Sequence, residues 1–281
     1  MAQFIGGQAL IEGVMMKSKS KVAFASRKPD GNIVVKKLNY SSFTEKHKVL
    51  QWPIIRGMIF LIELMFLGVK AMTWSANQQE ENENEKLSTK EMIGTIILAF
   101  GLTILMFVGV PYFFTKLFVS DHTFLFNLID GFFRLIIFLA YVIIIGLFKD
   151  VKRIFQYHGA EHKAVHCYES GRKMSVKNVQ KFSTLHPRCG TSLIIFIIVV
   201  SILLFSLIKT ELWYYNILLR ILIVPLIGGF GYEITKLSAK YSDNKFLHFL
   251  IVPGLWVQKL TTKQPDNDQV EIAIKALKEV L

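Results

Sequence analysis

The sequence predicts a mainly α-helical, polytopic membrane protein with about four transmembrane helices, an interfacial helix and a small N-terminal cytoplasmic β-hairpin. The first observation is the composition: 52% of the 281 residues are hydrophobic and only 19% are charged, which is too apolar for an ordinary soluble domain. The second is a set of four apolar stretches long enough to cross a bilayer as helices. The third is the placement of Lys and Arg, which lie almost entirely outside those stretches.

The N-terminal segment, residues 1–53, is expected to be cytoplasmic and to contain one hairpin. In KVAFASRKPDGNIVVKKL the turn-forming residues 29–32 separate two runs that contain β-branched and aromatic residues, which is the pattern of two paired strands. The chain begins with an apolar run that precedes its first lysines. This is the reverse of the order in a signal peptide, so no cleavage is expected.

Residues 54–76 are expected to form an interfacial amphipathic helix. Arg56, Glu63 and Lys70 recur every seven residues, and this spacing on a helix makes one narrow polar stripe beside an apolar surface. The alternative is a tilted fifth span whose polar stripe faces other helices. That layout would move the nine basic residues of 149–190 to the outside and is disfavoured for this reason. An acidic linker, 77–91, follows the helix.

Four apolar stretches are expected to be transmembrane helices, because about 20 helical residues cover about 30 Å of hydrocarbon. Short loops join the first two and the last two into transmembrane hairpins, 92–148 and 191–235. The remaining segment, 236–281, is expected to carry a C-terminal amphipathic helix capped near Asp266. The four stretches are 92–115, 124–148, 191–208 and 212–235.

The charge distribution predicts the orientation in the membrane. Of the 33 Lys and Arg residues, 29 lie before the first span, within 149–190 or after residue 235. By the positive-inside rule, both termini and the long 149–190 loop are then cytoplasmic. The same asymmetry accounts for the net charge of +12, so membrane lipids and not nucleic acid are the expected partners. Both cysteines are expected to be reduced in that compartment.

Histidines gather in the long loop, where the densest part is YHGAEHKAVHCYE. On a helix, His158, His162 and His166 are successive i, i+4 neighbours, so they share one face and two of them can bind one metal ion. The string HGAEH also fits the H-x-x-E-H spacing, in which two histidines bind zinc and the glutamate activates water. Glu161 is therefore the candidate catalytic base.

Two further positions compete for the third metal ligand. Glu233, which borders the fourth span, is one candidate, because an ionisable group at such a depth is costly unless it is paired. His186 is the other, and with Cys189 it forms an H-x-x-C pair that can complete a closed, structural zinc site. Glu12, in GGQALIEGVMM, reaches the same level if that apolar run dips into the interface.

Three charged residues lie within the predicted spans. Asp130 and Arg134 are i, i+4 neighbours on the second span, and Arg220 lies at a similar depth on the fourth. We interpret them as a buried ion network that holds the helices together, in preference to a conduction path.

At these positions the sequence resembles the YqhQ-type bacterial membrane proteins, a family of unknown function described as predicted metal-dependent enzymes. The motifs that carry the resemblance are GGQALIEGVMM, WPIIRG, YHGAEHKAV, HPRCGTS, GYE and PGLWVQKLTTKQP, and they are distributed over most of the chain. The resemblance implies a multi-pass protein of the bacterial cytoplasmic membrane and names no substrate. By this resemblance, the residues of this chain that occupy positions in the family's motifs are His158, Glu161, His162, His186, Arg188, Cys189 and Glu233.

Two functional hypotheses follow for the metal site. In the first, the protein is a zinc-dependent hydrolase that acts at the membrane surface, with His158, His162 and Glu233 or His186 as ligands and Glu161 as the base. In the second, it is a non-catalytic membrane scaffold or regulatory protein whose metal ties the long loop to the helices. A transporter is a weaker third hypothesis, since few polar residues line the spans. The ligand types do not separate zinc from Mn²⁺ or Fe²⁺.

Overall fold

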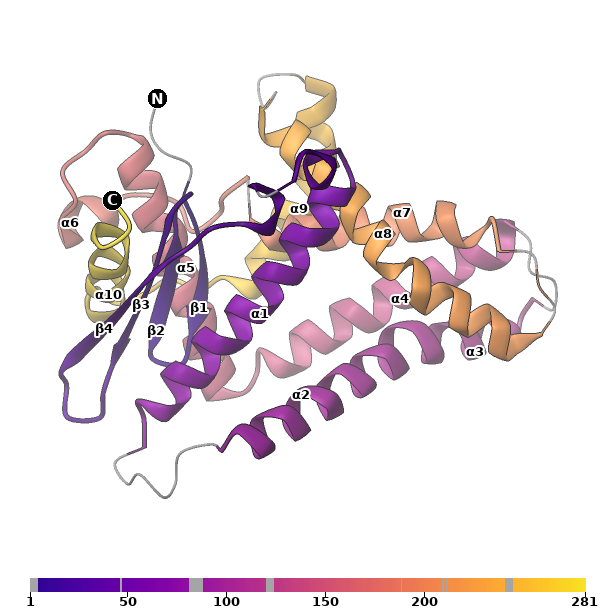
Figure 1. The fold of residues 1–281 in the computed structure, drawn as a ribbon, viewed down its shortest axis with the longest axis horizontal. Coiled ribbons are helices and arrows are strands. Elements are labelled where there is room, and N and C mark those ends of the chain that lie inside the picture. The colour runs from indigo at the N-terminus through magenta and orange to yellow at the C-terminus, as the bar shows by residue number, and fades with distance from the viewer. Residues whose placement is uncertain are drawn as a thin grey trace.

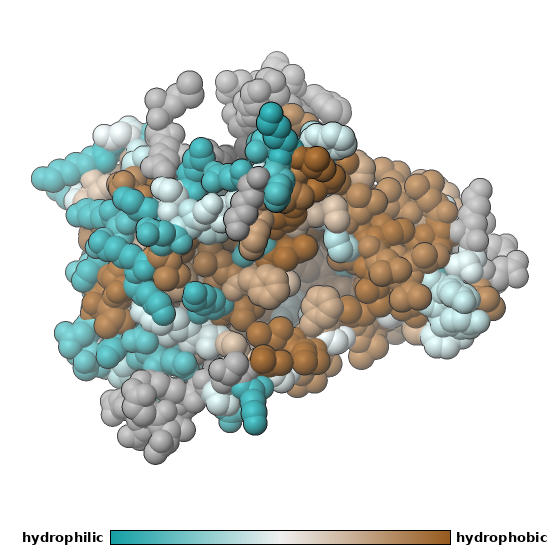
Figure 2. Space-filling view, viewed as in Figure 1, coloured by the Kyte–Doolittle hydropathy of each residue, from teal (hydrophilic) through white to brown (hydrophobic). Residues whose placement is uncertain are grey.

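The computed structural model is mainly helical, with a β-sheet at one end of the molecule. Figure 1 shows the strands together with α5, α6 and α10 at one end, and α2, α3, α4, α7 and α8 extending from it. Hydrophilic residues gather over the end with the sheet, and hydrophobic residues cover the helical end (Figure 2). The structure describes residues 5–45, 47–80, 88–119, 124–187, 189–208, 210, 212–240 and 245–281.

In the described part of the chain the strands come first, and the helices follow them. The strands are β1 (Gly6–Leu10), β2 (Gly13–Lys17), β3 (Lys21–Arg27) and β4 (Ile33–Asn39). The helices are α1 (Ile55–Asn77), α2 (Thr89–Ile104), the π-helical η4 (Leu105–Gly109), α3 (Val110–Lys116), α4 (Phe124–Ile145), α5 (Lys149–Glu169), α6 (Val176–Val179), α7 (Gly190–Phe205), α8 (Trp213–Lys240), α9 (Lys245–Thr261) and α10 (Asn267–Lys278).

The strands form an antiparallel meander in the order β1-β2-β3-β4. The predicted hairpin is present as β3 and β4, and its turn contains Gly31 at a φ of 86°, a conformation that favours glycine. The sequence did not predict β1 and β2, which pair through a tight turn at Glu12. The run GGQALIEGVMM is therefore a second hairpin within the sheet.

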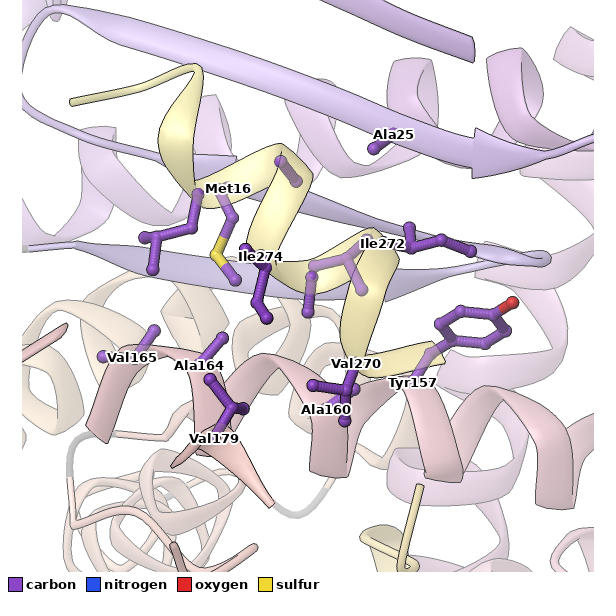
Figure 3. Close-up of a cluster of buried hydrophobic side chains, with 14 of the residues drawn as sticks. Met16, Ala25, Tyr157, Ala160, Ala164, Val165, Val179, Val270, Ile272 and Ile274 are labelled. Atoms are coloured by element: carbon purple, nitrogen blue, oxygen red, sulfur yellow. The ribbon is translucent and has the colours of Figure 1, made fainter. Parts of the chain in front are cut away.

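The sheet is covered on both faces. Side chains alternate between faces along a strand, so Met16 and Ala23 face a core shared with α5 and α10, whereas Met15 and Phe24 face α1. Figure 3 shows α10 packed against both the sheet and α5, with Ile274 near Met16. The predicted C-terminal amphipathic helix is present as α10, and Asp266 caps it in a reciprocal capping box with Gln269.

Among the described residues, three helices are long and apolar enough to cross a membrane: Lys90–Lys116, Phe124–Ile145 and Trp213–Leu237. They match the first, second and fourth predicted spans. The third, expected over 191–208, is the shorter helix α7, whose apolar part is Leu193–Phe205. Its 16 residues give about 24 Å at 1.5 Å per residue, which is less than the hydrocarbon thickness of about 30 Å.

Helix α1 lies between the sheet and α8. Its stripe of charges contacts other parts of the protein: Arg56 pairs with Glu233 of α8, and Glu63 accepts hydrogen bonds from the Tyr40 hydroxyl, at 2.5 Å, and the Phe43 amide, at 2.6 Å. Near Arg56, α1 approaches α8 so closely that a Cβ at Gly57 would lie 2.9 Å from the carbonyl oxygen of Gly229. The glycines therefore permit this helix crossing.

Candidate metal centre

Four imidazole rings form a continuous row beside α5. His158, His162 and His166 project from one face of the helix, as the i, i+4 spacing predicts, and His186 comes from the segment that precedes α7. The ring centroids of His158 and His162 are 4.4 Å apart, those of His162 and His186 are 5.7 Å apart, and those of His166 and His186 are 4.5 Å apart. The protein thus brings together all four histidines predicted from the sequence.

The first group of candidate ligands is His158, His162 and Cys189, whose ligand atoms lie within 4.8 Å of one another. His158 Nδ1 lies 2.9 Å from the Thr261 carbonyl oxygen, and His162 Nδ1 lies 2.5 Å from that of Thr184. Because a carbonyl oxygen only accepts, each Nδ1 carries the proton and each Nε2 keeps its lone pair. A backbone carbonyl that orients the ring in this way is the usual partner of a metal-binding histidine.

A second group consists of His166, Glu169 and His186, again with ligand atoms within 4.8 Å of one another. His166 Nε2 donates to the Leu185 carbonyl oxygen at 2.8 Å, and the ring of His166 stacks on Phe182 at an interplanar angle of 7°. Glu169 Oε2 lies 3.4 Å from His186 Nε2. Glu169 was not among the residues predicted from the sequence, although it follows His166 by three positions and so lies on the same helix face.

Glu161 is enclosed beside the imidazole row, with only 5% of its surface exposed. Its Oε2 lies 3.4 Å from His162 Nε2. Burial raises the pKa of the Glu161 carboxyl, while attraction to His158 and His186 acts in the opposite direction. Burial also lowers the pKa values of His162 and His186, which favours the neutral rings that bind metal ions.

Strand β1 and helix α9 hold this centre in place. A Cβ at Gly7 of β1 would lie 2.6 Å from Cγ of Glu161, so the sheet backs the glutamate directly. Gln258 of α9 is fully buried and clamps the backbone of His186, accepting from its N–H at 3.0 Å and donating to its carbonyl oxygen at 2.9 Å. The motif PGLWVQKLTT contains Gln258 and Thr261, but sequence reasoning gave neither a role.

Gly159→Ala is expected to destabilise the folded protein by about 1–3 kcal/mol, the range for overpacking. A Cβ at Gly159 would lie 2.1 Å from the Lys263 carbonyl oxygen, so α5 and the segment that orients His158 would have to separate. Thermal and denaturant unfolding in detergent measures this change. The matched control is Gly101→Ala in α2, where a Cβ meets nothing within 4 Å; it should be neutral or stabilising, because alanine is the better helix former. Equal effects of the two substitutions would contradict the assignment of a packing role to Gly159.

The structure separates two of the predicted site residues from the histidines. Both carboxylate oxygens of Glu233 accept hydrogen bonds from Arg56, with Nε at 2.6 Å, and Glu233 belongs to neither group found among the described residues. Glu12 pairs in the same way with Arg153 and accepts from the Tyr157 hydroxyl at 3.1 Å. The proposed third-ligand role of Glu233 is therefore not supported. Arg188 lies outside the described residues.

The three charged residues of the long apolar helices α4 and α8 meet in one buried network. Asp130 Oδ2 accepts from Arg134 at 2.6 Å and from Arg220 at 2.9 Å. Arg134 Nε donates to the Phe107 carbonyl oxygen at 2.8 Å. In an α-helix this carbonyl would accept from the N–H of residue 111, but residue 111 is a proline and has no N–H. Every other nitrogen of both guanidinium groups also donates to a protein acceptor; the remaining partners are Ser201, Asn127 and Asn216.

Comparisons with known proteins find a family model and a relative that match this chain in sequence. The family model described as "Protein of unknown function (DUF1385)" matches residues 52–281. The chain is 35% identical over 293 aligned positions to a Bacillus subtilis (strain 168) protein described as "Uncharacterized protein YqhQ", and the match covers 98% of this chain and 92% of that protein. No solved structure matches.

Proposed function

Since the chain belongs to the DUF1385 family, whose description assigns no function, we propose one from the geometry: a metal-dependent hydrolase that acts at the membrane surface. The proposed metal site is the first group, His158, His162 and Cys189. Two imidazoles and a thiolate suit zinc. Three protein ligands are also the number found in catalytic zinc sites, where a fourth position is left for water or substrate.

The observation that carries the proposal is the position of Glu161. Its carboxylate lies 3.4 Å from the Nε2 atom that His162 would offer to the metal. A divalent ion at this position would lower the pKa of a coordinated water and polarise a substrate oxygen. Glu161 would accept the proton from that water, and its raised pKa suits a group that must also return the proton to the leaving group.

The proposal includes a location. We place the metal centre and both termini on the cytoplasmic side of a bacterial membrane, because the basic residues concentrate in the segments that flank the apolar helices. This sidedness requires α7 and its adjoining residues to make a fourth crossing. Membrane lipids would then surround α2, α3, α4 and α8, whose exposed apolar side chains include Leu98, Phe132 and Leu222.

The burial of the ligands within the protein favours a second function, that of a structural metal site in a scaffold. Cys189 is 8% exposed and His162 is 3% exposed, and the ligands join α5 to the start of α7. If Glu161 or another group fills the fourth position, the metal sphere is closed and only links these segments. The two functions differ in whether the metal keeps a position that an added molecule can occupy.

Cobalt substitution tests this difference without knowledge of the substrate. The purified protein is loaded with Co²⁺, the charge-transfer band between Cys189 and cobalt is recorded, and acetohydroxamate is added as a probe of an open coordination position. A hydrolase site is expected to give a saturable spectral change, and a closed structural site none. His162→Ala is the control and should lose the Cys189 band.

The Glu161→Gln variant distinguishes a catalytic base from a fourth metal ligand. If Glu161 is the base, the variant keeps the Cys189 band and its response to acetohydroxamate, while hydrolysis of chromogenic esters by the zinc form falls about 10²–10⁴-fold, the usual contribution of a general base. If Glu161 is the fourth ligand, cobalt binds more weakly in the variant and the acetohydroxamate response, absent from the wild type, is gained.

A further inference from the structure

The second group of candidate ligands has no part in the proposed hydrolytic function. His166 and Glu169 come from the last turn of α5, and His186 comes from the segment before α7. Glu169 keeps a quarter of its side chain exposed, whereas His186 is 6% exposed. The three side chains thus form a partly open site of two imidazoles and one carboxylate, which carries one negative charge when the rings are neutral. Such a donor set suits zinc, manganese or iron.

The spacing of the donor atoms matches the ligands of a metal ion. Tetrahedral coordination at metal–ligand distances of 2.0–2.3 Å places neighbouring ligand atoms about 3.3–3.8 Å apart. In the second group, Glu169 Oε2 and His186 Nε2 are 3.4 Å apart. In the first group, His158 Nε2 and Cys189 Sγ are 3.3 Å apart. A hydrogen bond explains the Glu169–His186 distance less well, because N–H···O bonds usually measure 2.7–3.2 Å.

The rings of the second group are also held in orientation. The Leu185 carbonyl accepts from His166 Nε2 at 2.8 Å, and Phe182 stacks on the same ring. Gln258 fixes the backbone of His186 from both its N–H and its carbonyl. Because folding already fixes these rings, a metal ion that binds them would cost little further side-chain conformational entropy.

The two groups are neighbours. The His186 ring lies 5.7 Å from that of His162 in the first group and 4.5 Å from that of His166 in the second. Glu161 interacts electrostatically with His158 of the first group and with His186 of the second. The carboxylate of Glu161 lies 3.4 Å from His162 Nε2 in the first group, and the ring of His162 neighbours that of His186 in the second.

We propose that His166, Glu169 and His186 bind a second divalent metal ion, so that the protein holds a binuclear metal centre along α5. Paired metal ions in hydrolases stabilise both the attacking and the leaving oxygen of a displacement. The second ion would thus suit a substrate that presents two oxygens to the centre, such as a phosphoric or carboxylic ester. This role rests on the proposed hydrolytic function, whereas the second metal site itself does not.

Cobalt titration of the purified full-length protein tests the proposal. Wild-type protein is expected to bind two equivalents of Co²⁺; the Cys189 charge-transfer band follows only one of them, and visible ligand-field absorption follows both. Glu169→Gln, which preserves side-chain shape, is expected to bind one equivalent and to keep the full Cys189 band. That band also reports that the variant is folded. The matched control is Glu271→Gln on α10, a glutamate that pairs with Arg27, and it should still bind two equivalents.

Binding of a single equivalent by the wild type, or of two by Glu169→Gln, would overturn the second site. Failure of the hydrolase proposal has a different signature, since it appears as a Cys189 band that does not respond to acetohydroxamate while the stoichiometry of two is unchanged. Absence of any cobalt binding would overturn both.

Discussion

Asp130→Ala is expected to destabilise the helical part of the protein by about 3–5 kcal/mol, the usual result of removing one partner from a buried ion pair. Asp130 and Arg220 each have side chains that are 1% exposed, and that of Arg134 is 8% exposed. The substitution leaves two guanidinium groups without their shared carboxylate inside the helical part of the protein. Because a buried unpaired charge is costly there, the helices that carry the network should separate more easily.

Unfolding of the purified protein in detergent, by heat and by denaturant, measures this effect. The matched control is Ser201→Ala, which removes a neutral acceptor of Arg134 at 2.6 Å and is expected to cost about 1–3 kcal/mol, as for any buried donor left without its acceptor. An Asp130→Ala effect no larger than that of Ser201→Ala would show that the ion network does not hold the helices together. In that case Arg220 would be stabilised mainly by the rings of Phe205, Tyr112 and Phe126. Their centroids lie 4.7–5.6 Å from its guanidinium carbon.

Removal of the bound metal is expected to have the second large effect. A ligand present at 1,000 times its dissociation constant stabilises a protein by about 4 kcal/mol, so a chelator should lower the unfolding free energy of the wild type by about this amount. Cys189→Ser and His162→Ala should start from the lower stability and respond little to the chelator. The control is Cys167→Ser: Cys167 is also buried on α5, but it faces the core shared with α10 and belongs to neither group.

Periodic patterns predicted the elements that have one buried face. The hairpin β3–β4 was indicated by its turn residues, and α10 by its cap and apolar stripe. Strands β1 and β2 were missed, because the sheet buries both faces of GVMM between α1 and α5 with α10. A strand buried on both sides is a continuous apolar run, which alternation does not reveal.

The candidate metal centre was predictable where its residues share one helix. The i, i+4 spacing placed His158, His162 and His166 correctly, and the H-x-x-C pair brought His186 and Cys189 to them. The third-ligand role predicted for Glu233 is not supported, because its carboxylate pairs with Arg56, which is 177 positions away in sequence. Gln258 was missed because it acts through hydrogen bonds to the backbone of His186, which leave no pattern in a sequence.

The most direct test of the account is the metal content of purified wild-type, Cys189→Ser and Cys167→Ser proteins, measured by mass spectrometry after purification without chelator. We expect stoichiometric metal in the wild type and in Cys167→Ser, and the loss of one equivalent in Cys189→Ser. Wild-type protein that contains no metal and takes up no added Zn²⁺, or equal metal contents in all three proteins, would contradict a metal centre at His158, His162 and Cys189.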